Sequence, residues 1–117
     1  KNKVIAETEY YKDAFAIAKL SDVDDDIELS VAKAEIANEL INIKNVKASF
    51  VISRINDKYM ISSRSIDEVN VQLLMEKLGG GGHRSSAGAE ISAGSYEEVI
   101  NKIKKVIDEA EKEGGID

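Results

Sequence analysis

The sequence predicts an α/β domain, of the α+β-like kind, in which helices pack on one small sheet of mixed or antiparallel strands. Apolar residues alternate with other residues over 46–52 and 86–92, which predicts strands. They recur at helical spacing over 70–78 and 95–110, which predicts helices. No internal repeat or linker interrupts the pattern, so residues 1–117 are expected to form a single domain with its own core.

The N-terminal part of the chain is predicted to hold a strand and two helices. Val4-Ile5-Ala6 predicts a short buried strand, and residues 10–20 predict a helix. Asp25 and Glu28 have the spacing of a capping box that opens a second helix. The apolar side chains expected to face the core are Tyr11, Ala14, Phe15 and Ala18 in the first helix, and Leu29, Ala32, Ile36, Leu40 and Ile43 in the second.

A hairpin and a third helix are predicted in the middle of the chain. Asn56-Asp57 is the expected turn between a strand at 46–52 and a returning strand at 59–63. The helix over 70–78 is expected to end at Gly79, because glycine readily takes the left-handed conformation that follows many helices.

The last elements are a strand over 86–92 and a long helix. Ser95 and Glu98 form the clearest capping box in the chain, and Gly114-Gly115 is the expected end of the helix that they open. The residues expected to face the core are Val99, Ile100, Ile103, Val106, Ile107 and Ala110.

Composition excludes several classes of protein. The net charge of −6 speaks against a protein that wraps duplex nucleic acid. The absence of cysteine excludes disulfides and thiolate metal sites, and fits a reducing cytoplasm. No apolar run approaches the roughly 20 residues of a membrane-spanning helix, so no direct membrane contact is expected. The chain lacks a starting methionine, and we expect it to be part of a longer protein.

The charge is unevenly distributed along the chain. Residues 41–88 hold seven basic and four acidic residues, a net of +3, whereas the remainder holds nine basic and eighteen acidic residues, a net of −9. A small anionic ligand suits the locally positive part better than a long polyanion does.

The run Gly79-Gly80-Gly81-Gly82-His83 lies in this positive part. Four consecutive glycines are costly to order, and their lack of Cβ atoms lets backbone N–H groups approach an anion such as a phosphate. Two structural alternatives stay open: a helix C-cap followed by flexible glycines, or a loop that needs positive φ angles.

The only histidine and one arginine are the side chains that best suit such a ligand. His83 can donate a hydrogen bond to a phosphate or assist as a general acid, and Arg64 within Ser62-Ser63-Arg64-Ser65 can bind a phosphate bidentately. The alternatives are an exposed polar histidine and a solvated arginine on an edge strand. With one histidine and no cysteine, neither a metal site nor a serine triad can be assembled.

These motifs together resemble the DHH-associated domain of the DHH phosphoesterase superfamily. The family's loop reads roughly Gly-Gly-Gly-His-x-x-Ala-Ala-Gly, which is similar to residues 80–88 here, after a helix and a strand that ends in an arginine. Ser86 stands where the family usually has alanine. Within the superfamily, Ser63-Arg64-Ser65, Asn70-Val71-Gln72 and the segment 48–52 look most like the C-terminal part of cyclic-di-AMP phosphodiesterases of the GdpP type.

The resemblance implies that chemistry and binding are divided between two domains. An upstream DHH domain of the same polypeptide would bind two manganese ions, which activate water for attack on a phosphodiester. The present chain would bind the nucleotide substrate. It contains no DHH motif, so by itself it is expected to hold no cofactor, to contribute no catalytic residue beyond an assisting His83, and to be inactive.

The resemblance also assigns the binding residues. Gly80, Gly81, Gly82 and His83 would contact the phosphate. Arg64, with Ser63 and Ser65, would contact phosphate or base, and Asn70 would brace the loop or touch the ligand.

Three functions therefore remain as candidates for this domain. The first is the substrate-binding part of a cyclic-di-AMP phosphodiesterase, cytoplasmic even where the parent protein is anchored in a membrane. The second is the same part of an exonuclease or oligoribonuclease acting on linear dinucleotides. The third is an RNA-handling module like the C-terminal domain of alanyl-tRNA synthetases, against which the acidic charge and the few aromatic residues argue. A homodimer is compatible with each.

Overall fold

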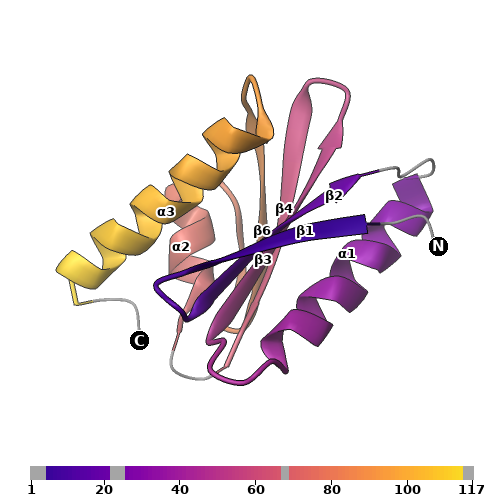
Figure 1. Ribbon diagram of the computed structural model, residues 1–117. Helices are drawn as coiled ribbons and strands as arrows, with labels where there is room; N and C mark the ends of the chain where they lie inside the picture. The colour runs from indigo at the N-terminus through magenta and orange to yellow at the C-terminus, as the bar shows by residue number, and fades with distance from the viewer. Residues whose placement is uncertain (1–4, 22–25, 67–68, 115–117) are drawn as a thin grey trace.

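A computed structural model describes residues 5–21, 26–66 and 69–114. One six-stranded sheet lies between α1 on one face and α2 and α3 on the other (Figure 1). The strand order is β1-β2-β3-β4-β6-β5, and β2 and β3 form a parallel pair while the other neighbours are antiparallel. The predicted fold class is confirmed.

The elements are β1 (Ile5–Tyr11), β2 (Phe15–Ser21), α1 (Asp26–Ile41), β3 (Ala48–Ile55), β4 (Lys58–Ser65), α2 (Val71–Lys77), β5 (Gly81–His83), β6 (Ser86–Ser92) and α3 (Tyr96–Lys112).

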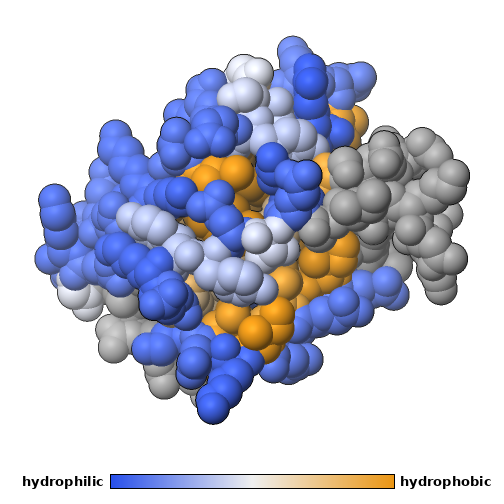
Figure 2. Space-filling model, viewed as in Figure 1, coloured by the Kyte–Doolittle hydropathy of each residue, from blue (hydrophilic) through white to orange (hydrophobic). Residues whose placement is uncertain are grey.

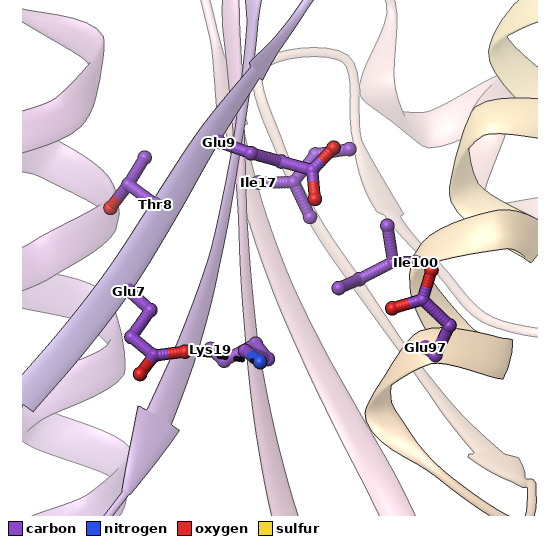
Figure 3. Close-up of a pocket in the computed structure, with 7 residues that line it drawn as sticks. All are labelled: Glu7, Thr8, Glu9, Ile17, Lys19, Glu97 and Ile100. Atoms are coloured by element: carbon purple, nitrogen blue, oxygen red, sulfur yellow. Dashed lines mark ion pairs between the residues drawn. The ribbon is translucent and has the colours of Figure 1, made fainter.

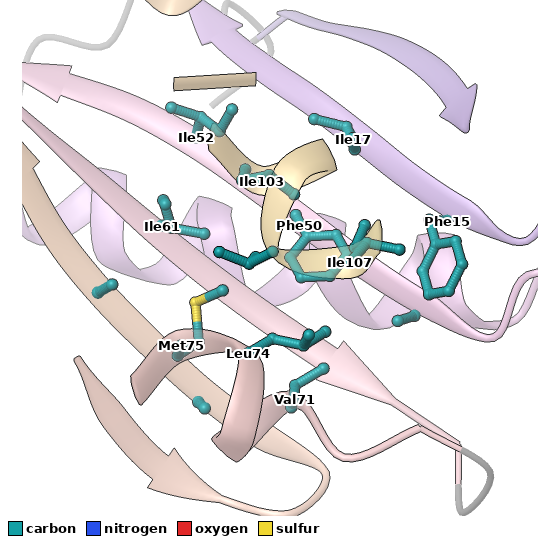
Figure 4. Packing of buried hydrophobic residues seen from close by; sticks show 14 of the residues in the cluster. Phe15, Ile17, Phe50, Ile52, Ile61, Val71, Leu74, Met75, Ile103 and Ile107 are labelled. Carbon is teal, nitrogen blue, oxygen red and sulfur yellow. The ribbon is translucent and has the colours of Figure 1, made fainter. Parts of the chain in front are cut away.

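The larger core lies between the sheet and the helices α2 and α3. Phe50 and Ile52 of β3, Leu74 of α2, and Ile103 and Ile107 of α3 are fully buried there (Figure 4). Burying each such side chain contributes about 1.5–3 kcal/mol to folding. The stripe predicted for α3 is confirmed in full, because all six of its residues are buried.

The strand β3 is buried on both faces, whereas the sequence predicted one buried face. Its alternate residues Phe50 and Ile52 enter the larger core, and Val51 enters a second core beneath α1. Ser49 is buried on this second side, where its Oγ donates a hydrogen bond to the carbonyl oxygen of Ala37 at 2.9 Å. A central strand that helices cover on both faces is buried at nearly every position. Its sequence therefore lacks the alternation of apolar and polar residues that marks a strand with one buried face.

The helix predicted over residues 10–20 is wrong. This segment is the end of β1, a turn and most of β2, and it forms an antiparallel hairpin. Phe15 to Ala18 are all buried, so the strand shows no polar alternation, and its apolar residues fit helical spacing by coincidence. Lys12 and Asp13 both have positive φ angles, 54° and 61°, in a turn that usually requires asparagine or glycine. The strand predicted at Val4-Ile5-Ala6 belongs to β1 from Ile5 onward, and Val4 lies outside the described residues.

Capping residues begin two of the helices, and the cap of α3 was predicted. The Asn70 side chain accepts a hydrogen bond from the Leu73 N–H group at the start of α2. The Ser95 side chain accepts one from the Glu98 N–H group at the start of α3, while the Glu98 side chain accepts one from the Gly94 N–H group. The capping box predicted at Asp25 and Glu28 lies outside the residues whose side chains the structure describes.

Candidate functional site

The candidate site lies where β4, β6 and β5 meet, on the face of the sheet that α1 covers only in part. His83 of β5 is paired with Ser86 of β6, and Ser86 is paired with Arg64 of β4. Directly paired residues of neighbouring strands share a face of the sheet, so these three side chains form one row across it. His83 is exposed, whereas Ser86 and Arg64 are half-buried.

Arg64 is held in this row by the backbone. Its Nη1 atom donates a hydrogen bond to the carbonyl oxygen of Ser63 at 2.9 Å. Its other N–H groups have no partner among the residues that the structure describes. A guanidinium group offers five donors in a planar fork, so most of the donors remain for an oxyanion such as a phosphate.

Three of the four consecutive glycines have a structural reason within the domain. Gly79 follows α2 with a φ of 87°, and Gly82 has a φ of 146°, so both take conformations that favour glycine. An added Cβ at Gly80 would clash with the carbonyl oxygen of Gly88, and one at Gly82 would lie 2.7 Å from that of Ser86. The two structural alternatives, the helix C-cap and the positive φ angle, therefore account for Gly79 and Gly82.

Gly81 is different, because the fold does not require it. An added Cβ at this position would have no atom within 4 Å, and its φ lies outside the left-handed region. Gly81 is paired with Gly88, which is paired in turn with Ser62, so the row next to that of Arg64 carries almost no side chain. This strip leaves the backbone of β5 open to close approach by a ligand.

The glycine run forms a strand rather than the cradle of consecutive N–H groups that the sequence suggested. The Gly80 N–H group donates to the Met75 carbonyl oxygen at 2.8 Å and so completes the end of α2. Residues 81–83 pair with β6, and successive N–H groups of a strand point to opposite edges. The backbone donors left for a ligand are therefore those on the outer edge of β5.

The other predicted residues hold the surrounding backbone in place. Ser63 is fully buried, and its Oγ donates a hydrogen bond to the Ala87 carbonyl oxygen at 2.8 Å. Ser65 Oγ contacts the carbonyl oxygens of Val69 and Arg84, at 2.7 Å and 3.2 Å. Ser63 therefore connects β4 to β6, and Ser65 connects it to the segment before α2 and to the turn between β5 and β6. Asn70 caps α2.

The sequence placed Ser62 beside Arg64 and marked Ser86 as a departure from the family, but neither of them nor Gly88 was assigned to the binding surface. All three lie in the two rows because of strand pairing between segments about 25 residues apart. The alternation in 86–92 was the only available signal, since it places residues 86 and 88 on the same face of a strand.

No metal site is formed by the part of the chain that the structure describes. Within residues 5–21, 26–66 and 69–114, no three histidine, cysteine, aspartate or glutamate residues group closely enough to hold an ion. The same residues include no helix that is long and apolar enough to cross a membrane.

Comparison with known proteins places this fold in a family. The DHHA1 domain family matches residues 12–113. The chain is 40% identical over 115 residues to cyclic-di-AMP phosphodiesterase GdpP of Bacillus subtilis, covering 97% of this chain and 17% of that protein. It is 36% identical over 109 residues to cyclic-di-AMP phosphodiesterase PdeA of Listeria monocytogenes, covering 92% of this chain and 16% of that one. It therefore spans about a sixth of the length of these relatives.

A solved structure shows the same fold. An exopolyphosphatase-related protein from Bacteroides fragilis matches with a TM-score of 0.72 and 23% sequence identity, covering 88% of this chain and 31% of that one. The family match extends from the turn after β1 to the end of α3 and includes every residue of the candidate site. The chain belongs to the DHHA1 domain family.

Proposed function

We propose that this domain is the substrate-binding part of a phosphodiesterase that hydrolyses cyclic-di-AMP. The observation that carries the proposal is the row of His83, Ser86 and Arg64 beside the open backbone at Gly81. Two relatives whose names state this activity align with nearly the whole chain, which supports the choice of substrate.

In this proposal the arginine and the histidine bind the phosphates of the nucleotide. The free N–H groups of Arg64 bind phosphate oxygens bidentately, and His83 donates a further hydrogen bond from the neighbouring strand. Gly81 lets the ligand reach the outer edge of β5, because no side chain covers the strand there.

The bond-breaking chemistry is assigned to a DHH domain that precedes this one in the same polypeptide. Manganese ions bound there would activate the attacking water. The residues described in this chain do not fit such a metal centre, and no step of the reaction is assigned to them. The proposed role of this chain is to bind and orient the substrate.

The test compares two arginines in a polypeptide in which a DHH domain precedes this chain. Arg64→Ala is expected to weaken binding of cyclic-di-AMP by about tenfold or more, because charge-assisted hydrogen bonds are lost. Arg54→Ala is the matched control: this arginine is exposed at the opposite end of the β3–β4 hairpin, where Nε binds the Asn56 carbonyl oxygen. Isothermal titration calorimetry measures both affinities.

If the Arg64→Ala and Arg54→Ala variants bind cyclic-di-AMP with equal affinity, the row that contains Arg64 is not part of the binding site. Competition with the linear dinucleotide identifies the substrate, since a linear substrate that binds and turns over better would favour the oligoribonuclease alternative. His83→Ala is expected to lower the affinity for cyclic-di-AMP or its turnover. If both values are unchanged, His83 does not belong to the binding site.

A further inference from the structure

A second surface lies at the other edge of the sheet, far from β5. Within the part of the chain that the structure describes, β1 is the outermost strand of the sheet and pairs only with β2. The outward backbone groups of such an edge strand can pair with another extended chain, a mode by which many domains bind peptides. The family match begins at residue 12, so β1 lies outside the residues that it includes.

A cleft of about 240 Å³ opens beside this edge, between the β1–β2 hairpin and α3 (Figure 3). Ile17 and Ile100 contribute apolar surface to it. The carboxylates of Glu7, Glu9 and Glu97 lie around that surface and outnumber the one ammonium group of the lining, that of Lys19. An apolar lining with acidic groups around it suits a long aliphatic side chain that ends in a positive charge.

One carboxylate beside the cleft remains available to pair with the positive end of such a side chain. Glu7 pairs with Lys19 at 3.0 Å, and the side chain of Glu9 pairs with Lys104 at 2.7 Å. Glu97 belongs to no ion pair within 4.0 Å among the described residues. The Glu7 side chain is 72% exposed, so its ion pair is solvated and exchanges partners at little cost.

The elements that form this edge and the cleft carry a small excess of negative charge. The strands β1 and β2 and the helix α3 hold seven acidic and five basic residues, a net charge of −2, and α1 lies on the other face of the sheet. Figure 2 shows hydrophilic residues over α3, with hydrophobic residues visible between hydrophilic ones near the centre of the view. A basic partner is therefore attracted to this side, whereas a nucleic acid is repelled.

We propose that the β1 edge and the adjoining cleft bind an extended, lysine- or arginine-bearing segment of a partner protein. The segment adds a strand to β1 through main-chain hydrogen bonds. Every second side chain points to the face that carries α3, where a basic one lies along Ile17 and Ile100 and places its charge near Glu97. The proposal is independent of nucleotide binding, because β1 and β5 are opposite edges of the sheet.

The acidic side chains also explain why a second copy of this chain is not the partner. If two β1 strands paired antiparallel around Thr8, Glu7 of each would lie opposite Glu9 of the other, on the same face of the joined sheet. Like charges placed directly opposite destabilise strand pairing. This edge therefore disfavours self-association and favours a basic strand.

The test uses a fluorescein-labelled peptide of alternating lysine and threonine, added to the 117-residue chain and followed by fluorescence anisotropy. Glu97→Gln is expected to weaken binding by about fivefold, the effect of losing one solvated ion pair. Glu39→Gln, which removes an equal charge from an exposed site on α1, is expected to leave the affinity unchanged. In NMR spectra the largest amide shifts are expected in β1 and near Glu97.

Two peptide controls separate strand addition from simple charge attraction. A peptide with N-methylated backbone nitrogens keeps its charge but loses its main-chain donors, and it is expected to bind at least about tenfold more weakly. Equal binding of the methylated peptide, equal effects of the two glutamate variants, or shifts confined to residues 80–90 would each overturn the proposal. A peptide with glutamate in place of lysine is expected not to bind.

Discussion

At the scale of single residues, consecutive glycines serve different purposes in this domain. Gly80 is required because the backbone of β6 passes against it, and its N–H group completes the end of α2. Gly81 has free space around it and an ordinary φ angle, so the folded domain by itself would accept a side chain there. The proposed nucleotide site supplies a reason for a glycine that the fold itself does not require.

This difference predicts opposite effects on stability. Gly80→Ala is expected to lower the free energy of unfolding by roughly 1–3 kcal/mol, because its Cβ would overlap the backbone of β6. Gly81→Ala is expected to raise it by about 0.4–1 kcal/mol, because alanine restricts the unfolded chain and meets no clash. Urea denaturation measures both. A loss of stability in the Gly81→Ala variant similar to that in Gly80→Ala would contradict the assignment.

At the scale of elements, α1 departs most from its predicted amphipathic pattern. The sequence expected Ile36, Leu40 and Ile43 along one apolar stripe, but Ile43 is 42% exposed just beyond the end of the helix. Leu40 is buried as expected, and Lys33, one of the polar residues of the pattern, is buried as well, with 7% of its surface exposed. Removal from water lowers the pKa of Lys33 from its ordinary value of 10.5, since burial disfavours the charged form.

The lowered pKa predicts a stability that depends on pH. Between the folded-state pKa of Lys33 and the unfolded value of 10.5, the unfolded chain binds more protons, so the free energy of unfolding rises with pH. Below the folded-state pKa the full cost of the buried charge is present. Lys33→Met is therefore expected to raise the free energy of unfolding at about pH 7 by roughly 1–2 kcal/mol, and by less at about pH 10.

Denaturation curves at both pH values measure this effect. Lys105→Met is the matched control, because Lys105 is exposed on α3, and its expected change is within about 0.5 kcal/mol. If the Lys33→Met variant is no more stable than the Lys105→Met variant at neutral pH, burial of the Lys33 ammonium group carries no cost in free energy of unfolding.

At the scale of the whole molecule, the sheet separates two surfaces of opposite character. The strand order places β5, with His83 and neighbouring Arg64, near one edge and the acidic strand β1 at the other. The ion pairs of Lys12 with Asp108 and of Lys104 with Glu9 fasten the β1–β2 hairpin onto α3. Residues 41–88 carry a net charge of only +3, which disfavours a long nucleic acid as a ligand.

This charge distribution predicts that the domain does not bind transfer RNA. A fluorescence titration at about 0.15 M salt is expected to show no saturable binding up to roughly 10 µM, because too few phosphates can be neutralised on this acidic protein. Binding that is tight and falls steeply with salt would instead support a role in RNA handling, as in the C-terminal domain of alanyl-tRNA synthetases.

The elements that could be predicted are those in which one face is buried and a local signal marks each end. Ser95, the apolar stripe of α3 and Gly79 after α2 are local features, and all three predictions are confirmed. Residues 10–20 were not predictable, because β2 is buried on both faces and its turn uses Lys12 and Asp13 in an unusual conformation.

For the candidate site, the sequence alone determined the identity and order of its residues: Arg64 at a strand end, the glycine run after a helix, and His83 at the end of that run. Only the tertiary structure decided that β5 pairs with β6 and β6 with β4, which brings His83, Ser86 and Arg64 into one row. The same pairing explains Gly80 and Gly82, and leaves Gly81 open. The physical reason is that strand partners are chosen by packing between distant segments, whereas caps and helical stripes depend on neighbours along the chain.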